Sequence, residues 1–150
     1  MVKKILAVLF LTFVLSFPAM AIEPPEGATI PYEGENTAYT AIMFNEVLEA
    51  YGLKFSTEAA QGVPSSFAKV EGDNVTFSDS SMAYLSSDYN AILTAYGLTL
   101  MPDKVTSELG KLLDSYATVK DDKVVFSDRV NVAYNPSEWK TILGAYSKAM

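Results

Sequence analysis

The stretch AYNPSEWKTILGAY at positions 133–146 has close counterparts at two earlier places in the chain. These are AYLSSDYNAILTAY at 83–96 and AYTAIMFNEVLEAY at 38–51, with the shared residues at the same offsets. In each copy an aromatic residue, a Val or Ile, a Leu and a final Tyr are spaced as one face of an α-helix requires. Self-similarity at spacings of 45 and 50 residues is typical of a repeated unit. The sequence therefore predicts three related amphipathic helices.

A second similarity lies ahead of the last two helices. FAKVEGDNVTFSD at 67–79 aligns without a gap with YATVKDDKVVFSD at 116–128. In both segments two short β-rich runs flank a polar turn, at 71–74 and at 120–123, which indicates a β-hairpin. The predicted repeats cover about 29–52, 66–97 and 115–147, and the first of them is shortened.

Local signals mark where the last helix begins. Asn135 is the expected N-cap, and Glu138 completes a capping box with it. Tyr134 precedes the cap and Trp139 is the fourth helical residue, so the two are predicted to form a hydrophobic staple. The sequence therefore predicts a buried Trp139.

The second helix has a weaker start and a clear end. Leu85 stands where a cap is expected and has no acceptor atom, so Ser86 or Ser87 is the predicted cap. Gly97 follows this helix and Gly52 follows the first one, which predicts left-handed C-terminal stops.

Hairpins that alternate with one-sided apolar helices favour an α+β fold. We expect an antiparallel sheet built from repeated hairpin–helix units, with the helices packed on one face. A further helix is predicted at 103–116, and a shorter helix or a loop at 56–64. All of this belongs to one predicted domain at 29–150, which is long enough to bury a core of its own.

The N-terminus has the pattern of a bacterial signal peptide. Lys3 and Lys4 precede an apolar run at 5–17, and PAMA at 18–21 offers small residues for cleavage after Ala21. A membrane anchor is the weaker interpretation, because the run is shorter than the roughly 20 residues that span a bilayer. We expect a signal peptide at 1–21, a flexible leader at 22–28, and a periplasmic or secreted protein without stable membrane insertion.

Composition excludes several chemistries. The chain has no His and no Cys, which removes Ser-His-Asp triads, cysteine nucleophiles and ordinary zinc sites. Its net charge is −7, and loss of Lys3 and Lys4 with the signal would make it −9, which disfavours nucleic acid. No cofactor-binding fingerprint is present, and the sequence predicts no cofactor.

Five residues are candidates for surface interaction. Ser78-Asp79 and Ser127-Asp128 end the second strand of each predicted hairpin, where turn formation is the alternative role. Tyr32 lies outside the repeated Tyr positions and is expected to be exposed enough to join a binding surface. No residue is assigned a catalytic or metal-binding role.

A divalent cation is the one metal that carboxylates and carbonyls alone could hold. The acids near Asp73 and Asp79, or near Asp122 and Asp128, are the places where a weak site would form. Their spacing does not match an EF-hand loop.

These observations favour an exported, non-catalytic binding domain whose partner is another protein of the envelope or outside the cell. One alternative is a carrier of a small apolar ligand between sheet and helices, lined by Phe44, Tyr89 and Trp139. The other is a small carboxylate-dependent hydrolase, which would need two acids that converge on a cleft.

Overall fold

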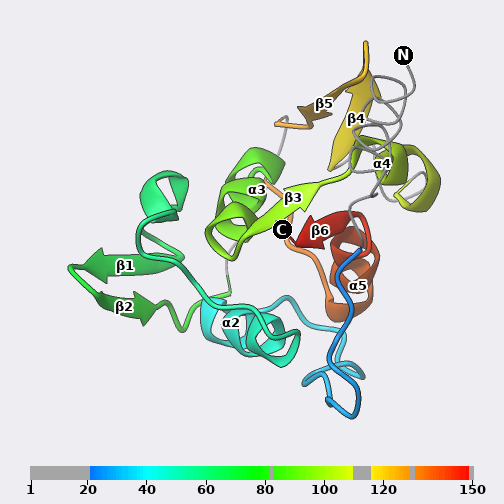
Figure 1. Cartoon of the computed structure of the whole chain (residues 1–150). Coiled ribbons are helices and arrows are strands. Elements are labelled where there is room, and N and C mark those ends of the chain that lie inside the picture. Colours follow the sequence, from blue (N-terminus) through cyan, green and yellow to red (C-terminus); the bar gives the residue numbers. More distant parts are fainter. Residues whose placement is uncertain (1–20, 82, 110–115, 129–130, 149–150) are drawn as a thin grey trace, which may run out of the picture.

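The computed structural model describes residues 21–81, 83–109, 116–128 and 131–148. The protein is mixed α+β, with helices and antiparallel strand pairs, as predicted (Figure 1). In chain order the elements are α2 (Ala41–Ala50), η1 (Ala60–Gly62), β1 (Ala68–Glu71), β2 (Asn74–Phe77), α3 (Ser86–Ala95), β3 (Leu98–Leu100), α4 (Pro102–Glu108), β4 (Ala117–Lys120), β5 (Lys123–Phe126), α5 (Pro136–Leu143) and β6 (Tyr146–Lys148).

The three helices of the repeated stretches all begin with a hydrophobic staple. Each has a Tyr immediately before its N-cap and an aromatic ring at its fourth helical residue, and the two rings meet edge to face. The ring centroids are 6.1 Å apart for Tyr39 and Phe44, 5.4 Å for Tyr84 and Tyr89, and 5.3 Å for Tyr134 and Trp139.

The predicted start of α5 is confirmed. The Asn135 side chain accepts a hydrogen bond from the Glu138 amide at 2.9 Å, and the Asn135 amide donates to Glu138 Oε1 at 3.1 Å. This is a complete capping box, with Pro136 at the first helical position. Gly52 and Gly97, with φ of 81° and 82°, are the left-handed residues expected behind α2 and α3.

Both predicted hairpins are confirmed, and their turns use different chemistry. Strands β1 and β2 are joined by two residues, of which Gly72 has a φ of 62°. The turn between β4 and β5 places Asp121 and Asp122 at φ 52° and 61°. Positive φ at both central residues is what a type I′ turn requires, and Asp is among the few residues that tolerate it.

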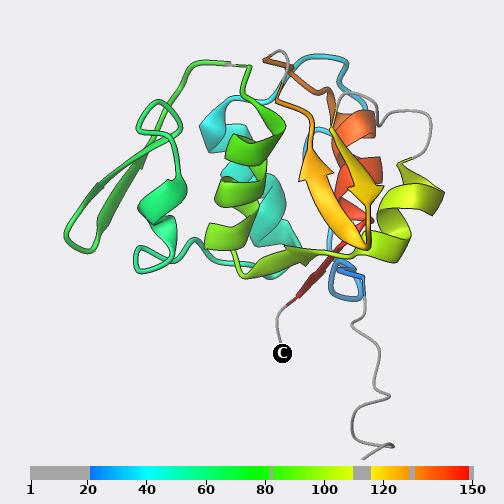
Figure 2. The ribbon, with the colours of Figure 1, turned by 90° about the horizontal axis from the view of Figure 1, so that it is seen from above.

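The expectation of one antiparallel sheet is corrected. The described strands form three separate two-stranded sheets, β1–β2, β3–β6 and β4–β5. Helix α3 lies between the two hairpins and keeps them apart (Figure 2). Several apolar hairpin residues pack, partly buried, against the core instead of a neighbouring strand, whereas Val70 and Val125 are 38% and 48% exposed. Each hairpin strand has only four residues, so each hairpin offers little surface that a larger sheet would bury.

The core is a continuous network of aromatic rings around Trp139. Its ring centroid lies 4.7 Å from that of Phe44 and 4.9 Å from that of Tyr89, so the staple residues of α2, α3 and α5 meet at one point. The hollow beside these rings measures about 20 Å³, which is room for about one water molecule. The described residues thus fill the space between Phe44, Tyr89 and Trp139 with their own side chains.

The remaining segments differ in length from the predictions. Helix α4 begins at Pro102 and ends at Glu108, while residues 110–115 of the predicted helix lie outside the described part. The 56–64 stretch contains only the short η1. The predicted signal peptide, except Ala21, lies outside the described residues. Just after it, the Ile22 amide donates to the Tyr146 carbonyl at 3.2 Å. Among the described helices, none has the length and apolarity to span a membrane.

Candidate functional site

The predicted candidates Ser127 and Asp128 cap a helix from another part of the chain. Helix α3 has Leu85 at its N-cap, whose side chain accepts no hydrogen bond from the helix amides. Asp128 Oδ1 accepts from the Ser87 amide at 3.1 Å, and the Ser86 hydroxyl lies 2.9 Å from the Ser127 carbonyl. The sequence predicted Ser86 or Ser87 as the cap. Both instead lie inside α3 as its first two residues, and both donate hydrogen bonds to the segment that follows β5.

We expect Asp128→Ala to lower the free energy of unfolding by about 0.5–2 kcal/mol, the usual cost of losing a cap. Asp128→Asn should be close to neutral, because Asn caps about as well as Asp. Asp79→Ala is the matched control, since Asp79 is exposed and its carboxylate makes no hydrogen bond to a described residue. Urea unfolding of the three variants measures the difference, and equal midpoints for the two Ala variants would contradict the capping role.

Ser78 and Asp79 hold the equivalent place beside α2. The Ser78 carbonyl accepts from the Ile42 amide at 3.3 Å, and the Ser78 hydroxyl oxygen accepts from the Ser80 amide at 3.2 Å. Ile42 is the second residue of α2, as Ser87 is of α3. The segments after β2 and β5 therefore each supply an acceptor to the second amide of a repeated helix, α2 and α3 respectively. This geometry gives the Ser-Asp pairs a role in folding, in which the Asp79 carboxylate takes no part.

Tyr32 fastens the turn at 31–34 to α2. It is half-buried, its hydroxyl donates to Glu46, and its ring centroid lies 6.3 Å from that of Tyr39. The hydrogen bond to the Glu46 carboxylate raises the pKa of Tyr32. Its backbone has a φ of 67°, a left-handed conformation that is unusual for a Tyr. The turn at 31–34 places Glu33 near Lys140 of α5.

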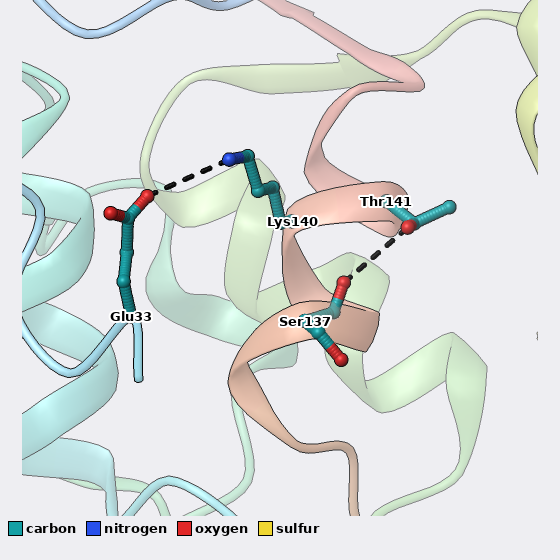
Figure 3. A network of polar contacts seen from close by, with 4 residues as sticks. All are labelled: Glu33, Ser137, Lys140 and Thr141. Atoms are coloured by element: carbon teal, nitrogen blue, oxygen red, sulfur yellow. Dashed lines mark hydrogen bonds and ion pairs between the residues drawn. The ribbon is translucent and has the colours of Figure 1, made fainter. Parts of the chain in front are cut away.

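Glu33 reaches a cleft that the sequence did not predict. The cleft between α2 and α5, here called the α2–α5 cleft, has a volume of about 280 Å³. Lys140 Nζ lies 3.6 Å from Glu33 Oε1 across its mouth, and Ser137 and Thr141 stand beside Lys140 on α5 (Figure 3). The lining residues are Ile30, Glu33, Tyr39, Val47, Tyr51, Pro136, Ser137, Trp139, Lys140 and Leu143.

The two tyrosines of the cleft stay protonated over the physiological range. Burial, followed by the electrostatic effects of the nearby Tyr51, Glu33 and Glu35, raises the pKa of Tyr39 to about 12. Burial and then the Glu33 carboxylate raise the pKa of Tyr51. Their hydroxyls are therefore available as hydrogen-bond donors, because ionisation would place a second negative charge close to Glu33.

A larger and more open hollow lies on the opposite face of α2. This hairpin groove has a volume of about 630 Å³ and runs between α2, the 53–58 segment and the β1–β2 hairpin. Phe55 forms its floor, with ring centroids 5.5 Å from Phe77 and 5.3 Å from Tyr96. The lining residues are Asn45, Glu49, Lys54, Phe55, Ser56, Thr57, Glu58, Asp73, Val75 and Phe77.

The hairpin groove has an acidic rim. Glu49, Glu58 and Asp73 contribute three carboxylates against the one ammonium group of Lys54. Asn45 Nδ2 donates to Glu49 Oε1 at 3.2 Å, and this contact holds one carboxylate in place. An apolar floor with a negative rim can hold a cationic, partly apolar ligand. It contains no His or Cys that could serve as a nucleophile or base.

Metal binding has no support in the described residues. Within the ranges that the structure describes, no three Asp or Glu side chains gather closely enough to hold an ion. Asp73 belongs to the hairpin groove, Asp122 to the β4–β5 turn and Asp128 to the cap of α3. Three of the four acids named for a weak divalent site thus lie at separate places in the fold, and the fourth, Asp79, is exposed.

Sequence reasoning missed both hollows, although one signal was available. Lys140 takes the position that Asn45 and Asn90 hold in the other two helices, directly after the staple aromatic. The comparisons with known proteins found no matching family model, no matching curated protein and no matching solved structure.

Proposed function

We propose that this protein is an exported, non-catalytic binding domain that holds a cationic segment of another protein in the hairpin groove. The observation that supports it most is the combination, in one open hollow, of the Phe55 floor with the carboxylates of Glu49, Glu58 and Asp73. An extended segment could lay an apolar side chain on the floor while its Lys or Arg residues face the rim.

The charge of the whole chain supports the same partner chemistry. The net charge, −7 for the whole chain and −9 after loss of the signal, attracts a cationic segment over several ångströms and accelerates its encounter with the groove. The partner's basic residues would meet exposed carboxylates, so each pair adds a modest amount of affinity that salt reduces. Recognition of this kind needs no proton transfer, which fits a domain without a His or a Cys.

Export is part of the proposal. The basic residues, apolar run and small-residue site of the first 21 positions support it. Cleavage after Ala21 would leave a chain that starts at Ile22, whose amide lies beside the Tyr146 carbonyl of β6. N-terminal sequencing of the exported protein should return Ile22 as the first residue.

We also propose that the groove-bearing scaffold arose from a repeated hairpin–helix unit. The three staples share the same helix positions, and the two hairpins pair in the same register. An experimental structure in which 66–97 and 115–147 did not superpose as hairpin followed by helix would contradict it.

Binding of a cationic peptide with alternating Lys and Leu residues tests the function. We expect titration calorimetry to detect binding at low salt, weaker binding as salt increases, and none for a Glu-Leu peptide of equal length. The double variant Glu58→Gln, Asp73→Asn should lose about 2- to 30-fold in affinity, the combined effect of two exposed ion pairs.

The leader provides a matched control. Glu23→Gln with Glu26→Gln removes two exposed negative charges outside the groove, so affinity should change far less. Equal losses in the two double variants would show that net charge alone attracts the peptide. That result, or no binding of the cationic peptide to the wild-type protein, would overturn the proposal.

A further inference from the structure

Two of the junctions, the places where one repeated helix packs against another, contain the same type of hydrogen bond. Tyr96, which follows α3, donates from its hydroxyl to Asn45 Oδ1 on α2 at 2.7 Å. Tyr146, which follows α5, donates to Asn90 Oδ1 on α3 at 3.0 Å. In each case the Asn stands directly after the staple aromatic of one helix, and the Tyr ends the repeated stretch of the next one.

The junction between α5 and α2 has different residues at the corresponding places. Lys140 replaces the Asn, and Tyr51 is the corresponding Tyr. A Lys ammonium group has no acceptor atom for a hydroxyl proton, so the bond of the other junctions cannot form. The Tyr51 hydroxyl has no hydrogen-bond partner among the described residues, and the α2–α5 cleft remains open at this place.

The chemistry of this opening favours an anionic head and an apolar body. Lys140 supplies the only ammonium group of its lining, and the hydroxyls of Tyr39 and Tyr51 are additional donors. Trp139, Val47 and Leu143 supply apolar walls. A volume of about 280 Å³ is slightly below the roughly 300 Å³ at which pockets for drug-sized ligands begin, so the ligand must be small.

Glu33 does not prevent such a ligand from binding. Its ion pair with Lys140 is 3.6 Å long, and the two side chains are 58% and 73% exposed. Exposed pairs of this kind contribute little, so a ligand carboxylate can take the place of Glu33 and leave it to water. Glu33 acts as a weak internal competitor, held near the cleft by the turn that Tyr32 fastens to α2.

We propose that the α2–α5 cleft binds a small carboxylate with an apolar body, such as an arylalkanoate, through Lys140 and the Tyr51 hydroxyl. This site is separate from the hairpin groove. Val47 and Tyr51 lie on one face of α2, while Asn45 and Glu49 lie about half a turn away on the other. The two binding activities can therefore be tested independently.

Trp139 allows a direct test, because it is the only Trp of the chain and it lines the cleft. We expect 3-phenylpropanoate to change its fluorescence in a saturable way, and 3-phenylpropylamine and 3-phenylpropanol to bind much more weakly. Lys140→Asn should lower the affinity for the carboxylate about 10-fold or more, because it removes the cation and gives Tyr51 an acceptor. Glu33→Gln should strengthen binding, because it removes the competitor.

Lys148→Asn is the matched control, since it removes one exposed Lys from β6 and leaves the cleft unchanged. It should bind as the wild-type protein does. Stronger binding of the amine than of the carboxylate, or unchanged carboxylate affinity in Lys140→Asn, would overturn the proposal. Neither outcome affects the cationic-peptide test, which uses the other face of α2.

Discussion

Trp139→Ala is expected to lower the free energy of unfolding by about 3–5 kcal/mol, the usual cost of truncating a buried large aromatic residue. Trp139 is 2% exposed and its ring contacts those of Phe44, Tyr89 and Tyr134, with centroids 4.7, 4.9 and 5.3 Å away. The three repeated helices meet at this ring. Its loss would leave a cavity that Phe44, Tyr89 and Tyr134 cannot fill unless their helices move.

Urea unfolding followed by far-ultraviolet circular dichroism measures this effect, because the variant has no Trp fluorescence. Ile42→Ala is the control, since Ile42 also belongs to a repeated helix but is 38% exposed. Its substitution should cost much less, because little apolar surface is returned to water. A Trp139→Ala midpoint close to that of the wild-type protein would show that the three helices do not depend on a shared aromatic core.

Alkaline pH is expected to unfold the protein in one cooperative step above about pH 10. Tyr116 and Tyr146 are buried, and their hydroxyl oxygens lie 2.5 Å apart. Burial raises the pKa of Tyr116 well above its ordinary value and also raises the pKa of Tyr146. Both groups therefore keep their protons in the folded state at a pH where the unfolded chain releases them.

The free energy of unfolding falls with rising pH because of this difference in proton binding. The stabilisation is fully present below the unfolded pKa of about 10 and is lost as pH rises toward the folded values. Each of the two tyrosines contributes a slope of about 1.4 kcal/mol per pH unit, so together they remove about 3 kcal/mol per unit. A domain with a stability of roughly 5–15 kcal/mol loses it within a few pH units.

Tyrosinate absorbance and circular dichroism should change together in this transition. The double variant Tyr116→Phe, Tyr146→Phe is the informative comparison, because it removes both ionisable groups. It should be less stable at neutral pH, where Asn90 loses the hydrogen bond from Tyr146, but its stability should fall less steeply above pH 10. Tyrosines that ionise near their ordinary pKa without any change in secondary structure would contradict the prediction.

The sequence by itself was sufficient for features that neighbouring residues determine. The capping box of Asn135 and Glu138 depends on atoms three residues apart, and the staple of Tyr134 and Trp139 on rings five residues apart. The two hairpins and the glycine helix stops likewise follow from local backbone preferences. These interactions form wherever the chain adopts the local structure, so residue type and spacing predict them.

The tertiary structure alone decided how the predicted elements meet. From Leu85 the sequence predicted Ser86 or Ser87 as the cap of α3, which is wrong, because only packing could bring Asp128 to the Ser87 amide across 41 residues of chain. The two hairpins belong to separate sheets because α3 stands between them, which no local pattern specifies. The α2–α5 cleft has the same origin. Lys140 was visible as an exception in the repeat, yet a cleft exists there because this junction brings α5 against α2, and contacts between distant segments depend on the summed packing of the whole chain.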